Sequence, residues 1–151
     1  MHNKNILKKI IKCQKPIDME KYINFCLYNK DGYYVNSKII GKEGDFVTAP
    51  EISQLFGELI GLYIYSFWEK NLFKEFNLVE LGPGRGTLLI DILNITKSFK
   101  KFNKLTKIFL IEKNKLLKKN QIENFKKFNI KPSDIEWLND FKIKNNKPTI
   151  I

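Results

Sequence analysis

The chain of 151 residues is 43% apolar, enough for the core of about one ordinary domain, and no apolar run approaches the roughly 18 to 20 residues of a membrane span. The chain has a single histidine, His2, beside the initiator methionine, which excludes Ser-His-Asp triads, Cys-His nucleophile pairs and His-based metal sites. It has two cysteines, Cys13 and Cys26, which are too few and too far apart for a disulfide scaffold. The net charge of +11 does not favour specific nucleic-acid binding, because only Arg85 among the 27 basic residues is an arginine, the residue that binds bases and phosphates bidentately.

The N-terminal third predicts a helical leader followed by a loop. Apolar residues at three- and four-residue spacing predict a helix over 18–28, and the loop after it contains the stretch Asp31-Gly32-Tyr33-Tyr34. A second helix is expected over 51–70. Apolar side chains cover most of its circumference, so we expect it to be buried on more than one side. Thr48 and Glu51, at the start of this helix, have the spacing of a capping box.

From residue 76 onward, strand and helix patterns alternate. Short apolar runs predict strands over 76–81, 107–112 and 135–138, and the segments between them predict helices over 87–100 and 114–128. Strict alternation requires right-handed crossovers between parallel strands. The predicted fold class is therefore α/β, a doubly wound parallel sheet with an N-terminal helical leader.

The turn after the first predicted strand is the main candidate site. It reads Glu80-Leu81-Gly82-Pro83-Gly84-Arg85-Gly86-Thr87, and glycines at such a turn let a ligand lie against the backbone, over the next helix N-terminus. A dinucleotide site requires G-x-G-x-x-G, whose third glycine would stand at Thr87. The pattern here, E-x-G-x-G-x-G, is instead typical of class I S-adenosylmethionine methyltransferases, with Glu80 as candidate acceptor for the cofactor's amino group. The candidate residues of the turn itself are Gly82, Pro83, Gly84 and Gly86.

Glu112 is the second candidate, because it closes the second predicted strand, where a carboxylate can accept both hydroxyls of a ribose. Several kinds of nucleotide site use such an acid, so Glu112 supports an adenosine ligand without choosing one. The alternative is a solvated acid that caps the following helix. Asn139 and Asp140, after the third predicted strand, could reach the adenine, and the ordinary polarity of a loop explains them equally well.

Five segments in order carry a resemblance to a known family. They are Leu27-Tyr28, Gly32-Tyr33-Tyr34, 44–52, 56–59 and 79–88. With the paired motifs GDFVTAPE and ELGPGRGT, the chain resembles the MidA-like class I methyltransferases linked to assembly of respiratory complex I. The resemblance implies an S-adenosylmethionine-dependent protein arginine methyltransferase with a protein substrate, a complex I subunit for the mitochondrial members. It also implies that Thr48 and Glu51 border the cofactor pocket.

The resemblance further implies an N-terminal fragment, because members of the family are considerably longer. Residues 148–151 look like the opening of a fourth strand, so the sheet is expected to be truncated after about the third strand, with the first strand left as an edge. We expect a leader and loop over 1–47 and the first half of the Rossmann-like cofactor domain over 48–151. The acceptor half is expected after residue 151, so we assign no catalytic residue and expect the fragment alone to be inactive.

Two alternatives stay open for function, a dinucleotide-binding module and a non-catalytic interaction fragment. For location, the first 18 residues show neither the apolar core of a secretory signal nor the Arg and Ser richness of a transit peptide. We expect the cytoplasm of a bacterium, which is the favoured alternative, and for a eukaryotic protein the resemblance implies the mitochondrion. The oligomeric state and the methyl acceptor cannot be predicted from the residues.

Overall fold

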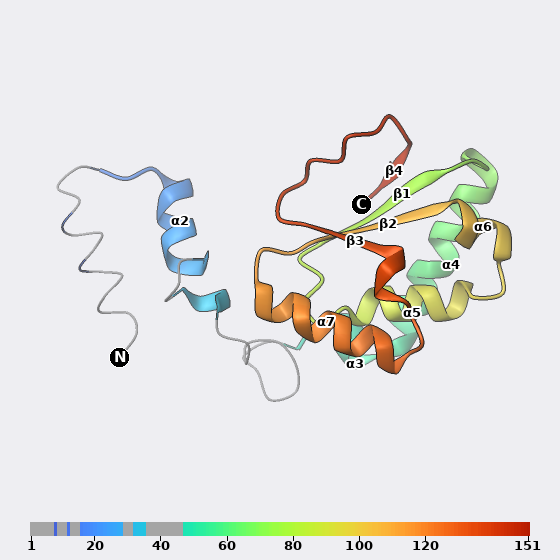
Figure 1. Ribbon diagram of the computed structural model, residues 1–151, viewed down its shortest axis with the longest axis horizontal. Helices are drawn as coiled ribbons and strands as arrows, with labels where there is room; N and C mark the ends of the chain where they lie inside the picture. Colours follow the sequence, from blue (N-terminus) through green and yellow to red (C-terminus); the bar gives the residue numbers. More distant parts are fainter. Residues whose placement is uncertain (1–7, 9–11, 13–15, 29–31, 36–46) are drawn as a thin grey trace.

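The computed structural model describes residues 8, 12, 16–28, 32–35 and 47–151. His2, Cys13 and the predicted motif residues 44–46 lie outside these ranges. The elements carry the labels of Figure 1 and are, in chain order, α2 (Met19–Tyr28), η1 (Tyr33–Val35), α3 (Ala49–Ile52), α4 (Gln54–Asn71), β1 (Phe76–Leu81), α5 (Thr87–Thr96), α6 (Lys100–Leu105), β2 (Thr106–Ile111), α7 (Lys115–Lys127), η2 (Pro132–Asp134), β3 (Ile135–Leu138) and β4 (Thr149–Ile150).

Four parallel strands form one sheet in the order β3-β2-β1-β4, which confirms the predicted parallel α/β class. The register pairs Phe76 with Thr106 and Leu81 with Ile111, so β1 and β2 end side by side. The chain adds β2 and β3 on one side of β1 and then returns to add β4 on the other. In open α/β sheets, ligands bind beyond the carboxyl ends of the strands at such a reversal.

The helices that connect the parallel strands lie on one face of the sheet. Both crossovers, through α5 and α7, move the chain in the same direction along the sheet, and right-handed crossovers then place both helices on the same side. In Figure 1 these helices run below the strands, while the connection from β3 to β4 runs above them. That connection is held by Asn77 on β1, which is fully buried and donates a hydrogen bond from Nδ2 to Oδ1 of Asn145 at 2.8 Å.

Aromatic side chains fix the amino end of β1 in the core. Trp68 of α4, Phe76 of β1 and Phe102 of α6 are almost completely buried, and the Phe102 ring centroid lies 5.3 Å and 5.5 Å from those of Trp68 and Phe76. The indole Nε1 of Trp68 donates to the carbonyl of Lys74 at 2.8 Å, so its burial leaves no unpaired donor. A firmly held amino end positions the carboxyl end of β1, where the turn begins.

The helix predicted over 87–100 is instead two helices, α5 and α6. The carbonyl of Thr96 accepts from the backbone N–H of Phe99 at 2.9 Å and from Nδ2 of Asn103 at 2.8 Å. The hydroxyl of Thr96 donates to the carbonyl of Ile92 at 2.7 Å. These side-chain bonds replace the regular helical bonds at this point, so α5 ends there.

The prediction that the helix over 51–70 is buried on more than one side is wrong. One side of α4 packs closely on α5, where a Cβ atom at Gly61 would lie 2.7 Å from Cγ2 of Ile95. On its other side Leu55, Leu59 and Tyr63 are 59%, 57% and 70% exposed. Although α4 is strongly apolar, neither it nor any other helix in the described ranges is long and apolar enough to cross a membrane.

The expectation that β1 is an edge strand is wrong at its amino end. The short strand β4 pairs with it in parallel, with Asn77 beside Thr149 and Leu78 beside Ile150. Within the described residues, this pairing stops before Val79, so the carboxyl half of β1 is paired on the β2 side alone. This half leads into the turn.

Candidate functional site

The turn between β1 and α5 contains three glycines with positive φ. Gly82, Gly84 and Gly86 have φ values of 65°, 56° and 80°, a region that L side chains rarely adopt. At Gly86 a Cβ atom would also lie 2.8 Å from Cζ of Phe125, so the turn packs directly against α7. Gly86 thus serves packing, and it is not among the described residues that line the two cavities that flank the turn.

The first cavity, which we call the Glu112 cavity, has a volume of about 290 Å³ and lies at the carboxyl ends of β1 and β2. The described residues that line it come from the leader, the turn and the start of α7. They are Tyr28, Tyr34, Gly82, Gly84, Glu112, Asn114 and Leu117. Glu112 is the one charged side chain among them, so the cavity offers a single carboxylate in otherwise neutral surroundings.

The carboxylate of Glu112 is held from two sides. Its Oε1 accepts from the backbone N–H of Asn114 at 2.8 Å, and its Oε2 accepts from Nε2 of Gln121 at 3.3 Å. Burial raises the pKa of Glu112 above its usual value, and these hydrogen bonds oppose the rise. Each carboxylate oxygen can accept a further bond. The side chain is thus oriented and still able to accept the two hydroxyls of a ribose.

Gln121 on α7 connects Glu112 to the glycine turn, and sequence reasoning missed it. It is fully buried, its Nε2 donates to the carbonyl of Gly84 at 2.9 Å as well as to Glu112, and its Oε1 accepts from Nε1 of Trp137 at 2.8 Å. A glutamine in a lysine-rich helix is ordinarily exposed. The one available signal was its place on the inward face, four residues after Leu117.

The second cavity, which we call the Glu51 cavity, has a volume of about 170 Å³ and flanks the turn together with the start of α3. It brings together six of the predicted site residues, and two of these, Gly82 and Gly84, also line the Glu112 cavity. The described residues that line it are Thr48, Pro50, Glu51, Glu80, Gly82, Pro83, Gly84, Arg85, Thr87 and Leu88.

The predicted capping box of Thr48 and Glu51 is wrong. Thr48 is the N-cap residue of α3, but its side chain makes no capping hydrogen bond. The carboxylate of Glu51 is directed instead to the glycine turn and the start of α5, where Oε1 accepts from Oγ1 of Thr87 at 2.6 Å and Oε2 lies 3.4 Å from Nη1 of Arg85. A partner distant in sequence has displaced the local one, and the contact holds the start of α3 against the first turn of α5.

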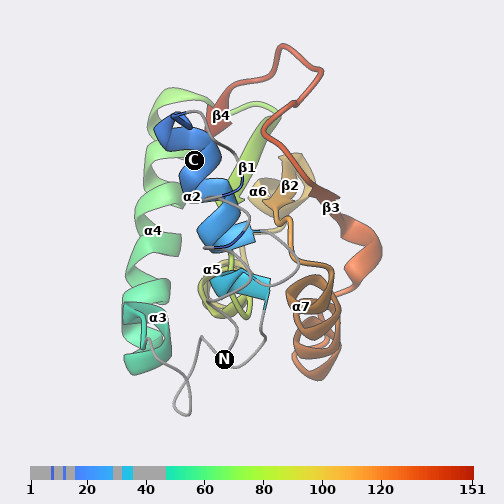
Figure 2. The same ribbon diagram turned by 90° about the vertical axis from the view of Figure 1, so that its left-hand side faces the viewer.

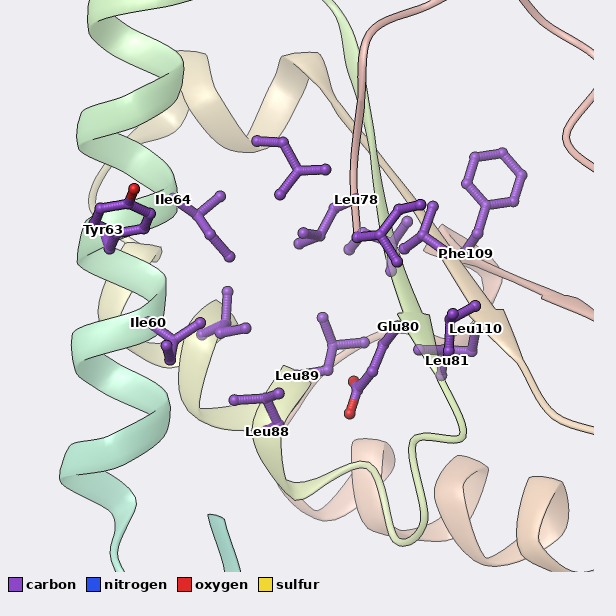
Figure 3. A pocket seen from close by; sticks show the side chains of 15 residues that line it. Ile60, Tyr63, Ile64, Leu78, Glu80, Leu81, Leu88, Leu89, Phe109 and Leu110 are labelled. Carbon is purple, nitrogen blue, oxygen red and sulfur yellow. The ribbon is translucent and has the colours of Figure 1, made fainter. Parts of the chain in front are cut away.

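Glu80 lines the Glu51 cavity and also a larger apolar cavity of about 480 Å³ between α4, α5 and β1. Figure 3 shows its carboxylate directed from β1 toward Leu88 and Leu89 of α5. Among the fifteen described residues around the apolar cavity, Glu80 is the one with an acidic side chain. Burial raises the pKa of Glu80 to about 7, so a cation beside it would favour the ionised form.

A second buried acid, Asp91, lies on α5 where this helix packs against Gly57 of α4. Its Oδ2 is buried without a hydrogen-bond partner in the described structure, and a Cβ atom at Gly57 would lie 2.8 Å from it. Burial, followed by the negative charges of Glu58 and Glu51, raises the pKa of Asp91 to about 6. The space that Asp91 occupies exists because residue 57 has no side chain.

Asn139 and Asp140 lie apart from both flanking cavities. Both side chains are exposed, and Oδ1 of Asp140 is 3.7 Å from Nζ of Lys113, the residue after Glu112. Neither is among the described residues that line the Glu112 cavity. The structure therefore gives no support to their contact with an adenine.

A parallel sheet of order β3-β2-β1-β4, with a glycine turn after β1 and acids at the ends of β1 and β2, is the Rossmann-like fold of class I methyltransferases. Residues 59–151 match the family model described as S-adenosyl-L-methionine-dependent methyltransferase. The chain belongs to this family, the MidA-like methyltransferases.

Curated relatives and a solved structure agree with this assignment. The mitochondrial protein arginine methyltransferase NDUFAF7 homolog of Drosophila melanogaster is 44% identical over 112 residues, 73% of this chain and 25% of that protein. The mitochondrial protein arginine methyltransferase NDUFAF7 of Bos taurus is 52% identical over 89 residues, 56% of this chain and 20% of that protein. This chain thus spans a quarter or less of the length of these relatives.

The fold is also that of a crystal structure from Burkholderia thailandensis, of a protein bound to S-adenosyl-homocysteine. The TM-score is 0.78 at 19% sequence identity, over 98% of this chain and 39% of that one. At this identity the likeness concerns the fold alone.

Proposed function

We propose that this chain is the cofactor-binding part of an S-adenosylmethionine-dependent protein arginine methyltransferase. The observation that carries the proposal is the pair of cavities on the two sides of the glycine turn, one with Glu112 and the other with Glu80. They offer separate places for the two ends of a molecule that is a nucleoside at one end and an amino acid at the other. The names of the relatives support the same reaction.

The residues present fit this cofactor. In the proposal Glu112 accepts the ribose hydroxyls and Gly82 and Gly84 let the ligand approach the backbone, while Glu80 faces the amino group. The cofactor, when bound, supplies an electrophilic methyl group. The protein's own part is to orient the ligand, and Gln121 and Thr87 do so indirectly, because they fix Glu112 and Glu51.

The remaining parts of the proposal concern the whole protein. We infer a protein substrate that is methylated on arginine, with a complex I subunit as the candidate, and a location in mitochondria for a eukaryotic or in the cytoplasm for a bacterial source. The relatives are mitochondrial by name. We also propose that residues 1–47 form the leader and 48–151 the first half of the cofactor domain, and that this chain alone transfers no methyl group.

Calorimetric titration of the 151-residue chain with S-adenosyl-homocysteine and, in parallel, with NAD tests the proposal. We expect binding of S-adenosyl-homocysteine and none of NAD, because Thr87 stands where a dinucleotide turn requires its third glycine. Gly84→Val should abolish binding, since a side chain at φ 56° is strained and fills the wall shared by both cavities. Binding of NAD alone, or of neither ligand, would contradict the proposal.

A further inference from the structure

Two tyrosines of the N-terminal leader reach the Glu112 cavity. Tyr28 ends α2 and Tyr34 lies in η1, and their rings stack with centroids 5.9 Å apart and an interplanar angle of 25°. Both line the cavity together with Glu112 and Leu117. In Figure 1, α2 and η1 lie beyond the carboxyl ends of the strands, next to the start of α7, and in Figure 2 they lie in front of the sheet. The leader therefore contributes to the wall of the candidate site.

The position of Tyr34 is tied to that of Glu112 through one residue, Asn114. Nδ2 of Asn114 donates to the carbonyl of Tyr34, 80 residues away, and the backbone N–H of Asn114 donates to Oε1 of Glu112. Oδ1 of Asn114 accepts from the N–H groups of Leu116 and Leu117 and so caps α7. Nζ of Lys113 lies 5.5 Å from the ring centroid of Tyr28. These contacts hold the tyrosines at a fixed place relative to the carboxylate.

The cavity thus combines one carboxylate with aromatic and apolar surface. A carboxylate suits the hydroxyls of a ribose, and the flat aromatic rings beside it suit the neutral π-face of a purine. Tyr28 is still 48% exposed, so a substantial part of its surface remains for contact with a ligand. We propose that Tyr28 and Tyr34 bind the adenine of the cofactor, so that the leader completes the nucleoside end of the site. This inference rests on the proposed function.

The test is calorimetric titration of the full chain and its variants with two probes, S-adenosyl-homocysteine and 5′-methylthioadenosine. The second probe has the same nucleoside and lacks the amino-acid end. We expect Tyr28→Ala and Tyr34→Ala to lower the affinity for both probes by the same factor, roughly 5- to 100-fold, because loss of an aromatic base contact acts on the shared adenine. Tyr34→Phe, which keeps the ring, should bind both probes about as well as the wild type.

The matched control is Tyr22→Ala, also on α2, where the side chain is 46% exposed and is not among the described residues of the cavity. It should leave both affinities unchanged. Because Tyr28 is exposed, Tyr28→Ala decides the question even if Tyr34→Ala does not fold.

Three other outcomes would overturn the inference, and they can be told apart. Wild-type protein that binds both probes, with alanine variants that bind equally well, would overturn the tyrosine assignment and leave the proposed function standing. Loss of S-adenosyl-homocysteine binding with unchanged 5′-methylthioadenosine binding would place the tyrosines at the amino-acid end instead. Wild-type protein that binds neither probe would overturn the proposed function as well.

Discussion

Replacement of Glu112 by glutamine perturbs the proposed ribose contact while the side chain keeps its length. Both carboxylate oxygens have partners, the N–H of Asn114 at 2.8 Å and Nε2 of Gln121 at 3.3 Å. A glutamine can still accept from Asn114, but its own NH₂ group then faces the NH₂ group of Gln121, which is held by the carbonyl of Gly84. One hydrogen bond is lost, so the free energy of unfolding should fall by about 1 kcal/mol.

The effect of Glu112→Gln on ligand affinity should be larger than its effect on stability. The variant loses the negative charge and one acceptor, so two charge-assisted bonds of roughly 1.5 to 3 kcal/mol each are weakened and one of them is in effect removed. The affinity for S-adenosyl-homocysteine should then fall about 10- to 100-fold. Calorimetric titration measures this loss, and chemical denaturation of the same sample measures the stability.

The matched control for Glu112→Gln is Glu136→Gln, an exposed acid on β3 whose Oε2 lies 3.6 Å from Nζ of Lys107. It removes the same charge away from the Glu112 cavity and should change neither affinity nor stability appreciably. Unchanged affinity in Glu112→Gln would refute the ribose contact. Equal losses in both variants would refute it too, because they would reveal a general effect of net charge.

Three further predictions concern the groups around the turn. Because burial raises the pKa of Glu80 from 4.5 to about 7, the folded state keeps a proton that the unfolded state has released, and the free energy of unfolding should fall by about 3 kcal/mol as the pH rises through this window. Glu80→Gln should flatten that decline in urea denaturation, and an equally steep profile would count against the buried carboxylate. Gln121→Leu leaves the carbonyl of Gly84 and the indole N–H of Trp137 unpaired, so the free energy of unfolding should fall by about 2 to 4 kcal/mol; an unchanged denaturation midpoint would disprove this. Gly86→Ala places a side chain at a φ of 80°, with its Cβ atom 2.8 Å from the ring of Phe125 on α7. The free energy of unfolding should therefore fall by roughly 1 to 3 kcal/mol in urea denaturation, and a change near zero would contradict this.

The sequence predicted the elements whose signals are local. The strand over 76–81 has the predicted bounds, because a short apolar run that ends at a glycine turn is typical of a buried strand. The helix predicted to start near Asn114 does so, and the side chain of Asn114 caps it as that residue type favours. The end of α5 could not be predicted, because it depends on side-chain bonds between Thr96 and Asn103, in the next helix.

The parts of the site that the sequence did not reveal depend on contacts between distant segments. Glu51 had a satisfactory local interpretation as half of a capping box, and the hydroxyl of Thr87, 36 residues away, provided a stronger partner. Gln121 and Tyr34 act through groups 37 and 80 residues away, so no local pattern marks them. The exposed side of α4 was not predicted, because the sequence shows where the apolar residues lie on the helix and does not show which other segments cover them.

The most direct measurement of the central claim, that the cofactor lies across the glycine turn, is an amide ¹H–¹⁵N NMR titration of the chain with S-adenosyl-homocysteine. We expect the largest shifts at Gly82, Gly84 and Glu112, with smaller shifts at Tyr28 and Tyr34. Shifts confined to other surfaces, such as the exposed side of α4 or the loop before β4, would contradict it.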